Sequence, residues 1–508
     1  MNTTMQRTKV RAGQPYLYRK NGLPSEVYEI RLHREVDHDA LCEAAARTMQ
    51  RYPYFAVRYL EENGDFYAVP NDLPFPVTHT PDLPPLGGTE NRYYLIGVTH
   101  DGCSVNVSFH HALADGRGVG RFVETLLWYY CKAAYGSTAP AQGILTEAVP
   151  VSERETADPC STRYPVDRSK LGRIEGLSRK GFTLPETKGE KASHRRYELR
   201  FPQEAFMQLC RRSGASPVVM LSVMMSRAIR SLHPEAGCIN SNFPVDARAA
   251  LGMDGTCQNC VKSISLPYGE AEEALSEQEL CSRYKALMNA QREPERCKDE
   301  FNKIVMLLDA VSHLHSFRKK RMVMRFLDDL KLDTYLISYV GQFRFGENAQ
   351  YIDSVHLFSD CSDGLVLNMT CQCGMFCIDM VQDFEGAQYV SALLEQFRAA
   401  DVPVESTQAI AFTTPCDHLM RDQPVMPEVL HGQRSLWERT VDANVRAYRA
   451  VRNGAVAGYA SVESAFVRTF LARPGETVGE ARLRLAGEQL ERDLHRRDAL
   501  ARMYRHSA

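Results

Sequence analysis

The sequence contains no long hydrophobic run and no excess of charge of either sign. Nowhere in the 508 residues do apolar side chains continue over the roughly 18 to 20 residues that a membrane-spanning helix needs. Residues 1–20 also lack the apolar centre of a secretion signal. The formal net charge of −2 provides no general attraction for nucleic acid or acidic membranes. We therefore expect a cytoplasmic protein with no membrane span and no nucleic-acid partner.

The composition is that of a folded protein, with 44% apolar and 24% charged residues, and the chain is long enough for two domain-sized cores. Its 15 cysteines are an odd number and are scattered, which favours reduced thiols. Cys257 and Cys260 have the spacing of a zinc site, and Cys371, Cys373 and Cys377 follow later. A second pair with that spacing is missing, and Cys371 and Cys373 alternate within a strand-like run, on one face. We expect no bound metal.

One segment combines two β-prone runs with a polar loop and an apolar helix. Residues 93–100 and 103–110 flank Asp101-Gly102, a dipeptide typical of two-residue type I′ hairpin turns. In the second run Val105, Val107 and Phe109 alternate with small polar residues, so one face of the strand is predicted to be buried. Apolar residues at helical spacing follow in residues 119–134. The loop between strand and helix therefore has a defined position.

That loop holds the sequence His110-His111-Ala-Leu-Ala-Asp115-Gly116. A histidine pair beside an Asp-Gly turn is, by default, a polar cluster with a structural role. Here, however, the pattern of two histidines, three further residues and Asp-Gly, between a strand and a helix, resembles the active-site motif of a known superfamily. This is the chloramphenicol acetyltransferase-like superfamily of CoA-dependent acyltransferases, which includes alcohol acetyltransferases and peptide synthetase condensation domains.

Further stretches resemble the same superfamily in the same order along the chain. Residues 37–60 resemble its first helix, which ends at an Arg-Tyr-Pro turn, and the return strand that follows. Residues 214–232 resemble the helix that opens its second half, with Ser216 as N-cap and Pro217 in the first turn. Residues 242–251 and Gln258-Asn259 resemble its second-half strand and loop. Residues 338–341 stand where relatives have a Ser-Asn-x-Gly strand.

The resemblance implies an α/β (α+β) fold of two halves, each a mixed sheet flanked by helices, with the active-site channel between them. We place the first half at residues 1–190, with a crossing segment at 137–193, and the second half at residues 195–400, with an amphipathic stretch at 302–332. Residues 401–508 contain no lysine and are predicted to form a mostly helical extension, with a helix within residues 478–504. They resemble nothing in the superfamily, and docking on the core, self-association and an appended region without its own chemistry all remain open.

The resemblance also implies roles for the motif residues. His111 would be the general base that removes the proton of the acceptor, without a covalent acyl-enzyme, and His110 would be structural. Asp115 would form an ion pair with Arg248, with the side chains within about 6 Å, and so hold the loop. Gly116 suits a backbone with positive φ or one that passes close to a ligand.

Two features leave alternatives open. Ser338 is either the donor that stabilises the oxyanion or an ordinary polar residue of a strand. Tyr339 stands where the superfamily usually has an asparagine after this serine. At a second position, in the helix after the histidine loop, Gly118 stands where many relatives have a serine. The basic run Arg318-Lys319-Lys320-Arg321 is either a solvated surface or a site for the phosphates of CoA.

We therefore expect an enzyme that transfers an acyl group, such as acetyl, from acyl-CoA to the hydroxyl or amine of a small molecule. Acyl-CoA would be a co-substrate, and no cofactor would be permanently bound. One alternative is transfer from the thioester of a carrier protein supplied in trans. Another is a noncatalytic relative that uses the channel for binding only.

Overall fold

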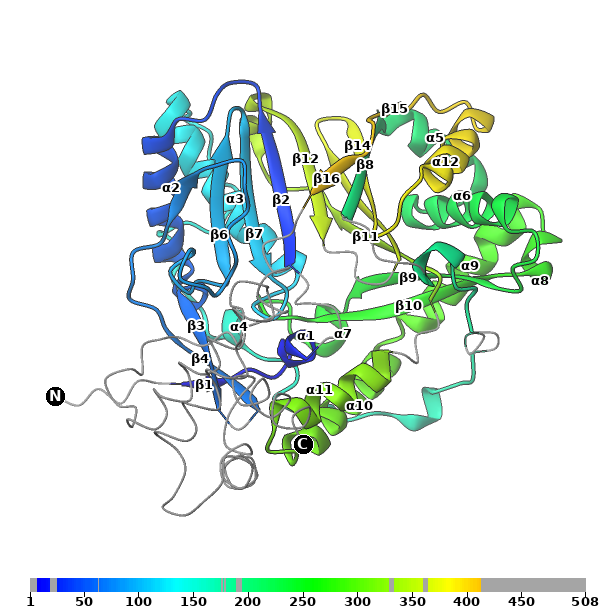
Figure 1. Ribbon diagram of the computed structural model, residues 1–508, viewed down its shortest axis with the longest axis horizontal. Helices are drawn as coiled ribbons and strands as arrows, with labels where there is room; N and C mark the ends of the chain where they lie inside the picture. Colours follow the sequence, from blue (N-terminus) through cyan, green and yellow to red (C-terminus); the bar gives the residue numbers. More distant parts are fainter. Residues whose placement is uncertain are drawn as a thin grey trace, which may run out of the picture.

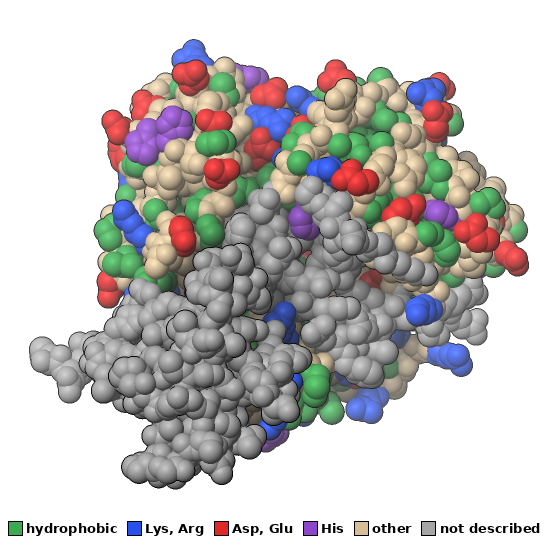
Figure 2. Space-filling view, in the orientation of Figure 1, with side chains coloured by type: hydrophobic (Ala, Val, Ile, Leu, Met, Phe, Trp, Pro, Cys, Tyr) green, Lys and Arg blue, Asp and Glu red, His purple; other side chains and the backbone are tan. Residues whose placement is uncertain are grey.

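The computed structural model describes residues 7–18, 25–62, 64–174, 177, 180–188, 194–328, 333–359 and 364–412. They form two α/β halves side by side, each built on a sheet flanked by helices (Figure 1). The predicted fold class is thus confirmed. On the face shown in Figure 2, acidic and basic side chains are interspersed over the described surface, in keeping with the small net charge.

The sheet of the first half has the strand order β12-β2-β7-β6-β5. Its strands are β2 (Ser25–Leu32), β5 (Val77–His79), β6 (Ile96–Asp101), β7 (Ser104–His110) and β12 (Ile352–Ser359). Helices α2 (His38–Arg51) and α3 (Gly116–Tyr135) pack against each other beside this sheet (Figure 1). On β7, Val105, Val107 and Phe109 are fully buried, as their alternation predicts.

A small sheet of order β1-β4-β3 adjoins the first half. Its strands are β1 (Thr8–Lys9), β3 (Val57–Glu62) and β4 (Asp65–Pro70). A single helical turn, η1 (Pro53–Phe55), joins α2 to β3 at the predicted Arg-Tyr-Pro turn, and the short helix α1 (Gln14–Leu17) follows β1. The N-terminal segment thereby reaches the predicted catalytic loop, since a Cβ added to Gly13 would stand only 1.9 Å from the Ala112 carbonyl oxygen.

The sheet of the second half has the order β10-β9-β11-β13-β14-β8-β15, and β16 also pairs with β8. The strands are β8 (His194–Pro202), β9 (Ile239–Asp246), β10 (Val261–Tyr268), β11 (Tyr335–Gly341), β13 (Leu365–Gln372), β14 (Met375–Gln382), β15 (Glu405–Ser406) and β16 (Ile410–Phe412). The helices of this half are α5 (Gln203–Ser213), α6 (Pro217–Leu232), α7 (Arg248–Leu251), α8 (Glu270–Glu273), α9 (Glu277–Gln291), α10 (Pro294–Ser312), α11 (Phe317–Asp328) and α12 (Gln388–Ala399). The Ser216 side chain caps α6 by accepting from the Val219 N–H, as predicted.

One strand crosses between the halves. β12 follows β11 and the single turn η4 (Gly346–Tyr351) in the chain, yet it pairs antiparallel with β2 at the edge of the first sheet. Its Val355 and Leu357 side chains belong to the core of the first half. The two halves are therefore joined by an exchanged strand as well as by the crossing segment.

Several local expectations are met with shifted boundaries. The hairpin turn consists of Gly102 and Cys103, because Asp101 pairs with Ser104. Only Gly102 has a positive φ, of 51°, so the turn has the type II′ pattern and the type I′ prediction was wrong. Helix α3 begins at Gly116, capped by the Asp115 carboxylate, and ends at the left-handed Gly136. The amphipathic stretch at 302–332 spans parts of two helices, α10 and α11, with a break after Ser312.

The crossing segment packs on the protein as short elements, α4 (Glu153–Thr156), η2 (Arg168–Lys170) and η3 (Pro185–Lys188). Of the predicted C-terminal extension, residues 401–412 are described, and they contribute β15 and β16 as edge strands on β8. The predicted helix within residues 478–504 lies outside the described residues. Within the described part of the chain, no helix is long and apolar enough to span a membrane.

Candidate active site

The loop His110–Gly116 leaves the end of β7 and enters α3, as predicted. It turns tightly, with the Leu113 N–H donating to the His110 carbonyl over 2.8 Å. Two tyrosines of the first half hold its backbone. Tyr59 Oη donates to the Ala112 carbonyl at 2.9 Å, and Tyr28 Oη donates to the Gly116 carbonyl at 2.8 Å.

The predicted ion pair between Asp115 and Arg248 is confirmed, with Arg248 Nη2 2.8 Å from Asp115 Oδ1 and both side chains 3% exposed. Asp115 also accepts from two backbone N–H groups, those of Gly118 at 2.8 Å and Cys260 at 2.9 Å. Arg248 donates further to the carbonyls of Thr256 and Gln258. The pair therefore links the N-terminus of α3 to the loop that precedes β10 in the other half.

The two glycines after Asp115 are explained by close contacts. A Cβ on Gly116 would lie 2.8 Å from Tyr28 Oη and 3.3 Å from a methyl group of Val340. Gly116 does not have a positive φ, so of its two predicted reasons only the close approach applies. A Cβ on Gly118 would lie 2.1 Å from the carbonyl oxygen of Cys257, which accounts for glycine where many relatives have serine.

His110 is fully buried, and its Nδ1 accepts from the Ala112 N–H at 2.8 Å. Burial, together with the neighbouring His111, lowers the pKa of His110 to about 3. The ring is therefore neutral at physiological pH. This geometry agrees with a structural role beneath the loop.

His111 is held on three sides. Its Nδ1 lies 2.8 Å from Asn259 Oδ1, and Asn259 Nδ2 donates to the His111 carbonyl at 2.7 Å. The ring of Tyr16, on α1, stacks on the imidazole at a centroid distance of 4.0 Å. Glu26, on β2, places Oε1 3.6 Å from His111 Nε2.

The Asn259 amide determines which nitrogen of His111 carries the proton. A backbone carbonyl only accepts, so the amide NH₂ group must face it and the amide oxygen must face Nδ1. Nδ1 is then the protonated nitrogen, and the lone pair is on Nε2. His111 therefore presents a basic nitrogen on the side where Glu26 lies.

Ser338 lies on β11, opposite Asn368 of β13, and is partly buried. Its neighbours Ile337 and Tyr339 both pack against the core of the second half, so Ser338 points to the opposite face of the sheet. Val340, which borders Gly116 and packs against the core of the first half, lies at an irregularity of the strand between Tyr339 and Gly341.

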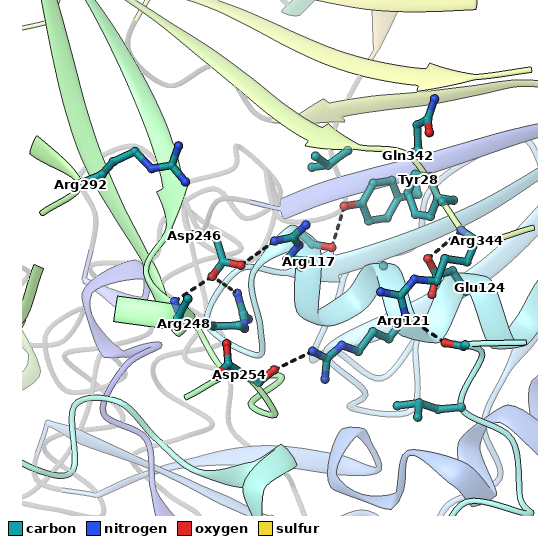
Figure 3. A pocket seen from close by; sticks show the side chains of 17 residues that line it. Tyr28, Arg117, Arg121, Glu124, Asp246, Arg248, Asp254, Arg292, Gln342 and Arg344 are labelled. Carbon is teal, nitrogen blue, oxygen red and sulfur yellow. Dashed lines mark hydrogen bonds and ion pairs between the residues drawn. The ribbon is translucent and has the colours of Figure 1, made fainter. Parts of the chain in front are cut away.

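Beside the loop is a pocket of about 490 Å³ with an arginine-rich lining (Figure 3). Arg117 and Arg121 come from α3, while Arg248, Arg292 and Arg344 come from the second half. The carboxylates among its lining residues are Glu124, Asp246 and Asp254. Arg117 pairs with Asp246 at 2.7 Å, and no described residue pairs with the Arg292 guanidinium. Counting Asp115, the buried partner of Arg248, five arginines face four carboxylates, and this excess of positive charge suits the pocket to an anionic group.

The basic run at 318–321 does not act as a unit. Lys320 is fully buried and pairs with Asp65 at 2.6 Å, so it belongs neither to a solvated surface nor to a phosphate site. Arg318 and Lys319 are exposed. The two interpretations of the sequence were therefore both wrong for Lys320, because the tertiary structure places a carboxylate from β4 beside it.

The cysteines considered as zinc ligands are not gathered. Cys371 is buried on β13, whereas Cys373 is exposed in the hairpin turn with φ of 51°, so the expectation that they share one face was wrong. Within the described residues, the one group of three or more side chains close enough to hold a metal ion is Glu198, His356 and Asp379, which contains no cysteine. The cation of Arg196 already lies among these groups, 2.7 Å from Asp379 and 2.8 Å from Glu198.

Sequence reasoning missed Glu26, Tyr16 and the arginine-rich pocket. Glu26 stands in an unremarkable alternating strand, and Tyr16 lies in a short N-terminal segment, so neither has a motif around it. The pocket arginines come from distant segments of the chain. Arg344, for example, donates to the carbonyl of Gly143, which lies 201 positions earlier. The sequence did point to Asn259, because Gln258-Asn259 resembles the superfamily's second-half loop, but the contact of Asn259 with His111 was not predicted.

The described structure has the fold of the chloramphenicol acetyltransferase-like acyltransferases, as comparison with solved structures shows. TRI101 of F. sporotrichioides, solved with coenzyme A and T-2, superposes with a TM-score of 0.51 at 12% identity, over 79% of this chain and 99% of that one. Polyketide synthase associated protein 5 of Mycobacterium tuberculosis gives a TM-score of 0.51 at 14% identity, over 78% and 99% of the two chains.

A nonribosomal peptide synthetase, FmoA3, gives a TM-score of 0.52 at 14% identity, over 78% of this chain but only 45% of its own. No family model and no curated protein sequence matches the chain. At these identities the likeness establishes the fold.

Proposed function

We propose that the protein is an acyltransferase that moves an acyl group from acyl-CoA to a hydroxyl or amine, with His111 as general base. The observation that supports this most is the environment of His111. Asn259 holds the proton on Nδ1, and the lone pair of Nε2 remains available. The loop that presents the ring is fixed by Asp115 and Arg248 from the other half. A positioned neutral imidazole is the group that general-base catalysis requires at neutral pH.

In the proposed reaction His111 Nε2 takes the proton of the acceptor as the acceptor attacks the thioester carbonyl. The tetrahedral oxyanion then collapses, and the imidazolium returns the proton to the departing thiolate of CoA. No acyl-enzyme forms, because no serine or cysteine nucleophile is in contact with His111 among the described residues. Ser338 is the proposed oxyanion donor, on the strand face opposite the core of the second half.

For the donor, we assign the phosphates of CoA to the arginine-rich pocket. Phosphate groups are bound by arginine through paired charge-assisted hydrogen bonds, and Arg292 is not engaged by any described side chain. The pocket reaches Gly116, the last residue of the catalytic loop. The crystallised complexes of TRI101 with coenzyme A support a CoA donor for this fold. A cytoplasmic location remains a prediction.

A carrier-protein thioester is the second candidate donor, supported by the similarity to the peptide synthetase FmoA3. Both donors present the acyl group as a thioester of phosphopantetheine, so the role of His111 is the same. A noncatalytic binding role is disfavoured by the free lone pair on Nε2, which binding alone does not need.

The test is thiol release from acetyl-CoA and longer acyl-CoAs, with a panel of alcohols and amines as acceptors. We expect His111→Ala to lower kcat/KM by about 10²- to 10⁴-fold, the usual contribution of a general base. His79→Ala, which removes an exposed histidine on β5, is the matched control and should retain full activity. If the wild type releases thiol from acyl-carrier protein but not from acyl-CoA, the donor assignment is wrong. If neither thioester reacts, the protein is a binding relative.

A further inference from the structure

Glu26 lies beside the predicted base and belongs to no recognised motif. It is opposite Phe109 in the pairing of β2 with β7, so its strand runs alongside the end of β7 where the catalytic loop begins. Its Oε1 lies 3.6 Å from His111 Nε2, and both side chains are only 14% exposed. Its Oε2 is 3.5 Å from the point where a Cβ on Gly116 would stand. The absence of a side chain at Gly116 keeps this space free.

Glu26 does not occupy the position of an orienting carboxylate. An orienting partner binds Nδ1, on the far side of the imidazole from the reacting nitrogen. That position is taken by Asn259. Glu26 is on the Nε2 side, where the atom that gives up its proton must bind. A nitrogen about 3 Å from Nε2 can therefore be about 3 Å from Glu26 Oε1 as well, since the two acceptors are 3.6 Å apart.

The charge of Glu26 has no fixed counterpart. Burial raises the pKa of Glu26, the nearby Asp115 raises it further, and His111 opposes both. Among the described residues no lysine or arginine forms an ion pair with Glu26, and the nearest group that could carry a positive charge is the His111 imidazole. An ionised carboxylate in such a place is stabilised by a cation within hydrogen-bond distance. If His111 supplies that cation, its lone pair is lost and it cannot act as a base.

We propose that Glu26 is a second catalytic base, which binds the acceptor as a cationic primary amine between its carboxylate and His111 Nε2. This inference rests on the proposed acyltransferase function and narrows its acceptor from a hydroxyl or amine to an amine. The ammonium group supplies the missing cation, so His111 stays neutral. Binding of the ammonium group thus leaves the lone pair of His111 Nε2 available to accept a proton.

An ammonium group that binds with all three protons must lose two of them to become an amide, and the two bases can take one each. The ammonium first gives one proton to His111 Nε2, and the resulting amine attacks the thioester carbonyl. The new C–N bond forms, the amine nitrogen loses its second proton to the Glu26 carboxylate, and the C–S bond breaks. The imidazolium then protonates the thiolate of CoA, and Glu26 releases its proton to solvent. The products are an amide, CoA thiol and one proton.

An alcohol needs only one of these groups. It loses a single proton, which His111 can both accept and return to the thiolate. A carboxylate beside the attacking oxygen of an alcohol supplies no further step. The pair of bases therefore predicts a preference for amines over alcohols of the same carbon skeleton.

The test compares matched acceptors, octylamine with octanol and 2-phenylethylamine with 2-phenylethanol, using acetyl-CoA and the full-length protein. We expect Glu26→Gln to lower kcat/KM for the amines by at least about 100-fold, as for the loss of a general base. For the alcohols the change should stay within about threefold. Glu26→Asp, which keeps the charge, should restore part of the amine activity. Glu43→Gln removes an exposed carboxylate of α2 and serves as the control without effect.

Binding provides a measurement that does not need turnover. By calorimetry, octylamine should bind Glu26→Gln at least about 30-fold more weakly than wild type, while octanol binds both alike. Thiol release with alcohols but not amines overturns the role of Glu26 and leaves the acyltransferase proposal standing. Equal losses for both acceptors in Glu26→Gln also overturn it. Thiol release with neither kind of acceptor, from acetyl-CoA, longer acyl-CoAs and acyl-carrier protein alike, refutes the acyltransferase proposal, and in that case unchanged octylamine binding in Glu26→Gln overturns the role of Glu26.

Discussion

Two buried ion-pair networks join the halves of this protein, and they differ in what they hold. The loop network consists of Asp115, Asp246 and Arg248, and its polar atoms mostly bind backbone groups around the His110–Gly116 loop. The sheet network links side chains to one another between the two large sheets, and consists of Glu29, Arg31, Arg196, Glu198, His356 and Asp379.

In the sheet network a single guanidinium is shared by three acids. Arg196 lies 2.9 Å from Glu29 on β2, 2.8 Å from Glu198 on β8 and 2.7 Å from Asp379 on β14. Burial acts to raise the pKa of Asp379, but Arg196 and His356 outweigh it and the pKa is lowered. None of these side chains contacts the catalytic loop in the described structure.

The difference shows that similar buried charges serve different ends. In the loop network, the charges set the path of a backbone that carries His111. In the sheet network they align strands from both halves and neutralise each other. Substitutions in the loop network are therefore expected to lower activity as well as stability, whereas substitutions in the sheet network are expected to lower stability alone.

The largest effect on stability is expected for Arg196→Met. It leaves three buried carboxylates without their shared cation, so the loss should reach or exceed the upper end of about 3 to 5 kcal/mol. Urea unfolding followed by circular dichroism measures this loss, and thiol release per folded molecule should be unchanged. Arg195→Met, which breaks a pair with the exposed Glu385, is the control and should cost about 1 kcal/mol or less. A fall in thiol release per folded molecule of Arg196→Met would show that the sheet network also affects activity, which would contradict the proposed difference between the two networks.

Asp115→Asn should lower both stability and activity. The Asn oxygen can still accept from the Gly118 N–H and Arg248, but its NH₂ group then faces the Cys260 N–H, and Arg248 keeps only Asp246 as a charged partner. We expect a loss of about 3 kcal/mol. Because the loop loses its fixed position, kcat of the folded protein should also fall. Asp246→Asn changes the more exposed acid of the same network and should have the milder effect on both. Unchanged kcat in Asp115→Asn would mean that the pair only stabilises the fold.

A smaller, pH-dependent effect is expected for His110. Its pKa is about 3 in the folded protein and about 6.5 when unfolded, so between these values the unfolded chain binds one more proton. Its contribution to stability therefore falls by about 1.4 kcal/mol for each pH unit below about 6.5. His110→Asn can keep the acceptor for the Ala112 N–H and should abolish this part of the pH dependence. Urea unfolding of both proteins at pH 7.5 and 5.5 tests this, and parallel losses would contradict it.

The parts of the fold that sequence predicted are those with local signals. The alternation on β7, the cap of α6 and the Arg-Tyr-Pro turn after α2 all lie within a few residues of the structure they determine. Pairing across the chain was predictable only where a motif supplied it, as for Asp115 and Arg248. The pairing of β12 with β2 and the burial of Lys320 against Asp65 have no such signal.

The same division applies to the active site. The sequence by itself determined the order of strand, histidine loop and capped helix, because hydrophobic periodicity, N-caps and glycines act over short distances. Tertiary structure alone decided what surrounds His111, since Tyr16, Glu26 and Asn259 arrive from three distant segments. It also decided which arginines form the pocket. Contacts of this kind depend on how the two halves pack together, and only the folded chain brings their charges and lone pairs within hydrogen-bond distance.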